Sequence, residues 1–275
     1  MVRLLRHFRQ AEARRNGDRH LLQKLRVIGD YLSGAGVYLP AEITADSIEA
    51  YLADQRLAGR SAKTLVNKRA DIGRFCHWLE RHGELDANPI HRVDPPKVPQ
   101  TEIVYLDEAE FALALAIAER TCPPALVALL TGARLGEIRA LRWSDVRQGR
   151  GGPVICFGST VPTKTNKVRS VPLHPRLAAL LSRLGPGAPE SLIFPRRCRR
   201  TWARMLREFK RAIPKMARRG GGWNIFRHTF ASLLVMRGER ISVVSKLLGH
   251  ASILTTQQFY AHLDCEWGRG AIGRL

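Results

Sequence analysis

The first third of the chain alternates apolar and polar residues with the period of α-helices. Leu21, Leu25, Ile28 and Leu32 recur every three or four residues, which places them on one helical face, and the pattern ends at the glycines of residues 34–36. We expect one helix there and two more along residues 46–83.

The second of these three helices is expected to begin at Asp46, because Glu49 three residues later completes a capping-box pattern. Ser61 is expected to cap the third, which should end near Gly83. Apolar stripes of this kind usually form a plain core. The buried positions expected in these two helices are Ile48, Tyr51, Leu52, Leu65, Ile72, Phe75, Cys76 and Leu79.

A proline-rich segment, residues 92–101 (RVDPPKVPQT), interrupts the helical pattern. Prolines cannot continue a helix and favour an extended connector. With 275 residues the chain is long enough for two domains. We therefore predict a helical domain over residues 1–97, a linker at about 92–103, and a second domain over residues 104–275.

The second domain mixes helical and strand patterns. Asp107 and Glu110 form another capping pattern, and residues 125–130 resemble a buried helix that ends at Gly132. Residues 154–157 and 170–173 predict two strands joined by a polar turn at 164–167. Helical spacing returns at Phe226, Phe230, Leu233 and Leu234, before Gly238. The predicted fold class is mainly α with a small β-sheet in the second domain.

The net charge indicates a class of binding partner, because Lys and Arg exceed Asp and Glu by 21 in a chain with an ordinary apolar fraction of 45%. A protein this basic usually binds a polyanion, and nucleic acid is the partner we expect; a ribosome-like structural role or a general arginine bias is the alternative. Residues 196–219 hold 11 Lys or Arg and one acid, Glu208. They form either a track along the DNA backbone or a solvated helix face. Further expected phosphate contacts are Arg60, Lys63, Lys68, Arg69 and Arg74.

Membranes, disulfide frameworks and cysteine zinc sites are not expected. No apolar run approaches the ~20 residues of a membrane span. The five cysteines are odd in number and form no C-x-x-C pair, which suits a reducing compartment. We expect a cytoplasmic protein.

Cleavage of a phosphodiester without a metal needs a nucleophile, cationic donors for the phosphoryl oxygens, and an acid for the leaving hydroxyl. Arginine binds phosphate oxygens in pairs and keeps its charge. Lysine can release a proton when its pKa is lowered, and tyrosine can attack when cations surround it.

Four segments in order carry these residue types: 131–141 (TGARLGEIRAL), 164–173 (KTNKVRSVPL), 226–231 (FRHTFA), and 247–256 (LLGHASILTT) with 259–262 (FYAH). Together they resemble the motifs of tyrosine recombinases, the family of phage integrases and Cre-like enzymes. The helical first half, with Asn88 and Pro89 before the linker, resembles the DNA core-binding domain of that family.

The resemblance implies a role for each motif residue. Arg134 and Arg227 would hold the scissile phosphate, Lys164 would protonate the leaving 5′-oxygen, and His250 would donate to a phosphoryl oxygen. Tyr260 would attack and form a 3′-phosphotyrosine. The family also implies double-stranded DNA with a specific recombination site, a homotetramer on paired sites, and neither a metal nor a nucleotide cofactor.

Two positions depart from the family pattern. The family usually has His or Lys where this chain has Asn224, which can orient a phosphate oxygen but cannot carry a proton. Its tyrosine usually follows the motif histidine by nine residues, where this chain has Phe259, one residue before Tyr260. We expect a bulge or longer turn at residues 257–258 to absorb the extra residue.

Some roles stay open. Glu137 either supports the site or is a surface carboxylate. Lys167 and Arg169 share the hairpin with Lys164, so the choice among them depends on the family alignment. His228 and His262 are expected to pack or to form hydrogen bonds, because no spacing supports a zinc site.

Three other functions compete with an active recombinase. The chain could keep the fold and bind DNA without cutting it, a hypothesis that Asn224 and the Phe259 register favour. It could be a topoisomerase with the same chemistry, although the hairpin and the LLGH segment count against this. A basic structural or RNA-binding protein would leave the ordered motifs unexplained.

Overall fold

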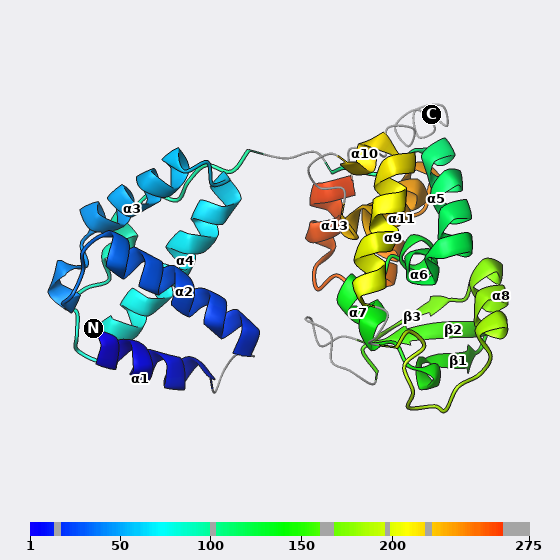
Figure 1. The fold of residues 1–275 in the computed structure, drawn as a ribbon, viewed down its shortest axis with the longest axis horizontal. Coiled ribbons are helices and arrows are strands. Elements are labelled where there is room, and N and C mark those ends of the chain that lie inside the picture. Colours follow the sequence, from blue (N-terminus) through cyan, green and yellow to red (C-terminus); the bar gives the residue numbers. More distant parts are fainter. Residues whose placement is uncertain (14–17, 100–102, 160–167, 196–198, 218–221, 261–275) are drawn as a thin grey trace, which may run out of the picture. The chain divides into compact units, whose positions relative to one another are not determined.

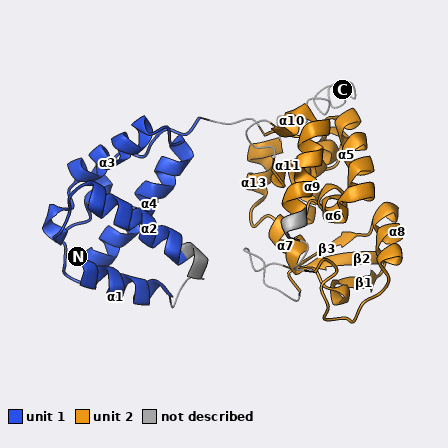
Figure 2. Ribbon diagram, viewed as in Figure 1, with its two compact units in different colours: residues 1–101 blue, residues 102–275 orange. Residues whose placement is uncertain are grey.

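The computed structural model describes residues 1–13, 18–99, 103–159, 168–195, 199–217 and 222–260. The chain divides into two compact units, residues 1–101 and 102–275, which Figure 2 shows in different colours. No helix in the described ranges is long and apolar enough to cross a membrane.

Unit 1 is helical throughout its described part (Figure 1). Its apolar core includes Phe8 from the first helix, Tyr31 from the second and Phe75 from the fourth, with edge-to-face contact between the Phe8 and Phe75 rings. The elements are α1 (Val2–Ala13), α2 (Asp18–Gly34), the 3-10 turn η1 (Pro40–Glu42), α3 (Ala45–Leu57), α4 (Ala62–Arg81) and η2 (Pro89–Arg92).

The prediction for α4 is confirmed in detail. The Ser61 side chain accepts a hydrogen bond from the Thr64 amide at the helix start, and all five predicted core positions are buried. The prediction for α3 is wrong about the cap. Thr44, not Asp46, caps this helix, because the chain is extended at Thr44 and its hydroxyl accepts from the Ser47 amide at 3.1 Å. Helix α1 was not predicted, since Phe8 is its single buried residue.

Two of the cations expected to contact phosphate have partners inside unit 1. The Arg69 guanidinium donates to the carbonyls of Ile90 and Val93, so it holds the end of the unit against α4. The Lys68 ammonium donates to the Tyr51 hydroxyl at 2.8 Å. The other three, Arg60, Lys63 and Arg74, are exposed.

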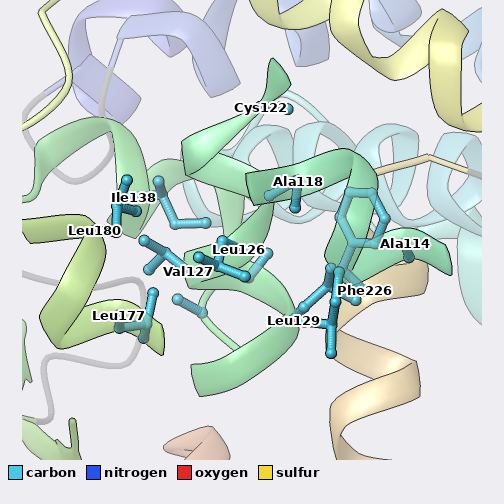
Figure 3. Close-up of a cluster of buried hydrophobic side chains, with 14 of the residues drawn as sticks. Ala114, Ala118, Cys122, Leu126, Val127, Leu129, Ile138, Leu177, Leu180 and Phe226 are labelled. Carbon is cyan, nitrogen blue, oxygen red and sulfur yellow. The ribbon is translucent and has the colours of Figure 1, made fainter. Parts of the chain in front are cut away.

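Unit 2 is built around α6, which is buried on nearly all sides. Helices α5, α7, α8 and α11 contact it, and Figure 3 shows the side chains that fill this core, among them Leu126, Leu129 and Phe226. The helices are α5 (Glu108–Thr121), α6 (Pro123–Thr131), α7 (Leu135–Ala140), the 3-10 turn η3 (Trp143–Asp145), α8 (Pro175–Leu184), α9 (Arg199–Ala212), α10 (Pro214–Ala217), α11 (Asn224–Met236), α12 (Ile241–Leu248) and α13 (Ile253–Tyr260).

A three-stranded antiparallel sheet in the order β1-β2-β3 completes unit 2 (Figure 1). The predicted strands appear as β2 (Gly152–Phe157) and β3 (Arg169–Pro172), paired so that Phe157 lies opposite Arg169. Strand β1 (Val146–Gly149) was not predicted, because its sequence VRQG shows no clear alternation. The predicted turn at residues 164–167 lies outside the described residues.

Two glycines end the helices that lead into the functional motifs. Gly132 follows α6 and Gly249 follows α12, both in the left-handed region with φ of 63° and 64°. A Cβ at Gly132 would lie 2.6 Å from the Phe230 ring, and one at Gly249 would lie 2.9 Å from the Arg169 side chain. Only glycine gives both the backbone conformation and the space.

Candidate active site

Arg134 comes directly before α7, and Glu137 in the first turn of that helix fixes it. The Glu137 carboxylate accepts from the Arg134 amide at 2.7 Å and from its guanidinium at 3.3 Å. Arg134 keeps 33% of its side-chain surface exposed, whereas Glu137 keeps 7%. Glu137 is therefore a buried anchor for Arg134 and not a surface carboxylate.

Arg169, at the start of β3, is the second partner of Glu137. Both terminal nitrogens of Arg169 donate to the carboxylate, at 2.8 and 2.7 Å, and its Nε donates to the Leu247 carbonyl. The guanidinium also lies 4.5 Å from the centre of the Phe157 ring. Burial alone would raise the pKa of Glu137, but the hydrogen bonds and charges of Arg169 and Arg134 outweigh it and lower that pKa.

The role of Arg169 was missed in the sequence, although a signal exists. Along β3, Arg169 and Val171 are buried while the residues after each are exposed. Strand alternation thus turns Arg169 to the same side as an apolar residue, and a cation there needs an acidic partner. Arg169 links the hairpin strand to the Arg134 motif and to the end of α12.

Arg227 lies in α11 and is 6% exposed. One terminal nitrogen donates to the Gly132 carbonyl at 2.6 Å and the other to the Leu248 carbonyl at 2.7 Å. Burial, together with the positive charges of Arg134 and Arg169, lowers the pKa of Arg227 to about 9, so the side chain stays charged at neutral pH. Arg227 thereby joins the segment before Arg134 to the segment before His250.

His250 follows Gly249, and its Nδ1 lies 2.8 Å from the hydroxyl of the buried Thr256 in α13. Burial and the charges of Arg227, Arg134 and Arg169 lower the pKa of His250 to about 4. The ring is neutral at pH 7, with one nitrogen as donor and the other as acceptor.

Tyr260 is the last residue of α13 and is 2% exposed, whereas Phe259 is 38% exposed. The bulge expected at residues 257–258 is wrong, because the helix continues without interruption from Ile253 to Tyr260. In a regular helix Thr256 and Tyr260 share one face, and that face is turned inward. The start of the helix, not a break within it, turns Tyr260 inward.

The Tyr260 hydroxyl lies 2.8 Å from Nδ1 of His228 in α11. Burial raises the pKa of Tyr260 to about 12, although the Arg227 charge acts against this. Burial and the same charge lower the pKa of His228. The expectation that His228 forms hydrogen bonds is confirmed, and its partner is the tyrosine singled out as the nucleophile.

Two predicted site residues make no described contact with this cluster, Asn224 because it is exposed and Lys164 because the structure does not describe it. Asn224 is the first residue of α11 and is exposed. Lys164, like Lys167 and His262, lies outside the described residues. Within the described ranges no three His, Cys, Asp or Glu side chains gather in a way that could hold a metal ion.

Residues 106–266 match the phage integrase family. The tyrosine recombinase XerC of Xanthomonas axonopodis pv. citri is 30% identical over 239 residues, which cover 82% of this chain and 75% of that protein. The chain belongs to the phage integrase family. It is a site-specific tyrosine recombinase, which cleaves and rejoins DNA.

Solved structures share the fold of this recombinase. A lambda integrase dimer bound to a COC′ core site has a TM-score of 0.73 and 19% identity, with 94% of both chains covered. A lambda integrase tetramer bound to a Holliday junction has a TM-score of 0.73 and 20% identity, covering 94% of this chain and 76% of that one.

Proposed function

We propose that the recombinase cleaves duplex DNA by attack of Tyr260 on the scissile phosphate, which forms a 3′-phosphotyrosine and frees a 5′-hydroxyl. The observation that carries the proposal is the position of Arg227. It bonds the carbonyls of Gly132 and Leu248, so it ties the Arg134 motif to the His250 motif beside the helix that ends in Tyr260.

Each described residue then has a chemical task. Arg134 and Arg227 bind the non-bridging oxygens and stabilise the charge that grows in the transition state. In the tautomer that this proposal requires for His250, Nε2 carries the ring proton and donates to a phosphoryl oxygen. Nδ1 then accepts from the Thr256 hydroxyl, 2.8 Å away. Asn224 is exposed at the start of α11, where its amide can orient the phosphate or its neighbouring sugar.

A suicide substrate, which traps the covalent complex, tests the nucleophile. Tyr260→Phe should give no adduct, because it removes the attacking oxygen, while Phe259→Ala should keep it. Both variants should still bind DNA in a gel-shift measurement. An adduct in Tyr260→Phe would assign the attack to another residue. No adduct in the unsubstituted chain would favour the alternative, a DNA-binding protein that keeps the fold without cleaving.

Lys164 is our proposed acid for the leaving 5′-oxygen, on the strength of its motif. A substrate with sulfur at the 5′-bridging position has a leaving group that needs no proton. It should restore cleavage by Lys164→Ala and leave Arg134→Ala impaired. If Lys164→Ala stays slow on this substrate, the acid is another residue, with Lys167 next to be tested.

The reaction is proposed to need neither a metal nor a nucleotide, because arginines supply the positive charge and the phosphotyrosine keeps the phosphodiester energy. Cleavage should therefore continue in EDTA, and activity that returns only with magnesium would contradict this.

Unit 1 is proposed as the DNA core-binding domain, with Arg60, Lys63 and Arg74 as exposed phosphate contacts. We also propose that the recombinase binds double-stranded DNA and that four copies of the chain act on two paired sites. The lambda integrase dimer on a core site and the lambda integrase tetramer on a Holliday junction support this proposal. Because its proposed substrate is DNA, we propose that the recombinase acts in the cytoplasm.

A further inference from the structure

A tyrosine nucleophile must lose its proton, and the usual acceptor position does not offer an acceptor in this chain. The family resemblance puts His or Lys where Asn224 stands, and an amide takes up no proton near neutral pH. Tyr260 needs a proton acceptor, because burial raises its pKa to about 12. The hydroxyl keeps its proton until attack begins.

His228 lies one helical turn after Asn224, on the same side of α11. A helical side chain leans toward the turn before its own Cα, so His228 covers the turn in which Asn224 lies. Its Nδ1 is 2.8 Å from the Tyr260 hydroxyl, within direct proton-transfer reach.

Both partners are neutral at pH 7, because burial and the Arg227 charge lower the pKa of His228 below its ordinary value. In the His228 tautomer with its proton on Nε2, the Tyr260 hydroxyl donates and Nδ1 accepts. The hydrogen bond thus points in the direction in which the proton has to leave.

We infer that His228 is the proton acceptor of Tyr260 in strand cleavage. It replaces the His or Lys that the family usually has at the position of Asn224. The inference rests on the proposed function, in which Tyr260 is the nucleophile. As the Tyr260 oxygen bonds to phosphorus, its proton passes to Nδ1 of His228. The bond from phosphorus to the 5′-oxygen breaks, and that oxygen leaves with a proton from the separate acid.

Religation reverses each step. The 5′-hydroxyl attacks the phosphotyrosine and gives its proton back to the leaving-group acid, the bond from the Tyr260 oxygen to phosphorus breaks, and the His228 imidazolium returns its proton to that oxygen. Transfer before attack is unfavourable, since the phenolate that it would leave is far more basic than the imidazole. Bonding to phosphorus removes that basicity, so the transfer accompanies the attack.

The experiment must separate proton transfer from simple positioning. His228→Asn keeps a hydrogen-bond acceptor near the place of Nδ1 but takes up no proton. Its single-turnover cleavage rate is measured with natural Tyr260 and with a fluorinated tyrosine at position 260, whose phenol ionises near neutral pH. His228→Gln serves as a second variant, His77→Asn as an exposed control, and thermal unfolding with DNA binding checks the fold.

We expect His228→Asn to slow cleavage by about 10²–10⁴-fold with natural tyrosine, the range of general base catalysis. With fluorotyrosine the loss should be below about tenfold, while Arg134→Ala should stay impaired with either tyrosine. An equal loss with both tyrosines, or no loss at all, would overturn the inference. Faster cleavage would also overturn it, because His228 would then only restrain Tyr260 in its buried position.

Tyr260→Phe is run beside these variants. If it forms no adduct and His228→Asn fails the test above, the inference is lost and the proposed nucleophile stands. If Tyr260→Phe does form an adduct, the proposed function is lost and the inference with it.

Discussion

Two groups of described arginines in unit 2 lie in different settings. Arg169 and Arg227 are buried, and each guanidinium bonds carboxylate or carbonyl oxygens. In α9, by contrast, Arg204, Arg207 and Arg211 are exposed, while Trp202 and Phe209 on the other side of the helix are buried.

The same residue type therefore does two different things. Burying a cation costs several kcal/mol unless partners compensate it, and those partners then fix its position. A fixed guanidinium can hold one phosphate in one geometry. An exposed one attracts any nearby phosphate, at a strength that falls as salt rises.

The largest expected effect comes from Arg227→Lys. A lysine keeps the charge but cannot bond two carbonyls and still present a fork to phosphate. Loss of such a donor should lower the cleavage rate by about 10²–10³-fold in a single-turnover assay. The matched variant Arg207→Lys, on the exposed face of α9, should cleave DNA at the same rate as the unsubstituted chain. Equal rates for both variants would remove the distinction between the two settings.

A smaller effect is expected on stability from Glu137→Gln. It leaves Arg169 buried without its anion, which should reduce the free energy of unfolding by about 3–5 kcal/mol. The control is Glu108→Gln, whose pair with Arg237 is more than half exposed on both sides and should contribute at most about 1 kcal/mol. Urea unfolding measures both, and a similar loss in the two variants would contradict the account.

The same carboxylate should make stability depend on pH. Because the fold lowers the pKa of Glu137, its stabilisation is complete above the unfolded pKa of about 4.3 and is lost as pH falls through the lower folded-state pKa. Unfolding midpoints between pH 3 and 7 should fall less steeply in Glu137→Gln than in the unsubstituted chain. Parallel curves would show that Glu137 does not carry this dependence.

The smallest effect is expected from replacing Arg204, Arg207 and Arg211 together with alanine. The slope of log K against log salt for duplex DNA should become shallower by about 0.9 for each lost phosphate contact. Stability should change by less than about 0.5 kcal/mol per site, because these side chains are exposed. An unchanged slope would exclude this face of α9 from the DNA interface.

Long helices with a regular apolar stripe could be predicted from the sequence. A short helix whose buried face depends on the segment before it could not. In α4 the stripe from Leu65 to Leu79 repeats over about four turns and follows a serine cap, so the helix, its ends and its buried face could all be predicted from spacing. Helix α13 has only eight residues, and its inward face depends on where it begins after Gly249. Spacing alone pointed to a bulge there, but the helix is regular.

Motif residues could likewise be chosen before their partners were known. Arg134, Arg227, His250 and Tyr260 carry recognisable local patterns. The contacts of Arg169 with Glu137 and of His228 with Tyr260 join residues 32 positions apart in each case, and no local rule pairs them. Such pairs emerge only when distant strands and helices pack.

The most direct test is to identify the residue that becomes bonded to DNA. The trapped complex from a suicide substrate is digested with nuclease and protease, and the modified peptide is sequenced by mass spectrometry. We predict a nucleotide phosphate attached to the oxygen of Tyr260, next to an unmodified Phe259. A phosphate attached to any other side chain, such as Tyr105, would contradict the account.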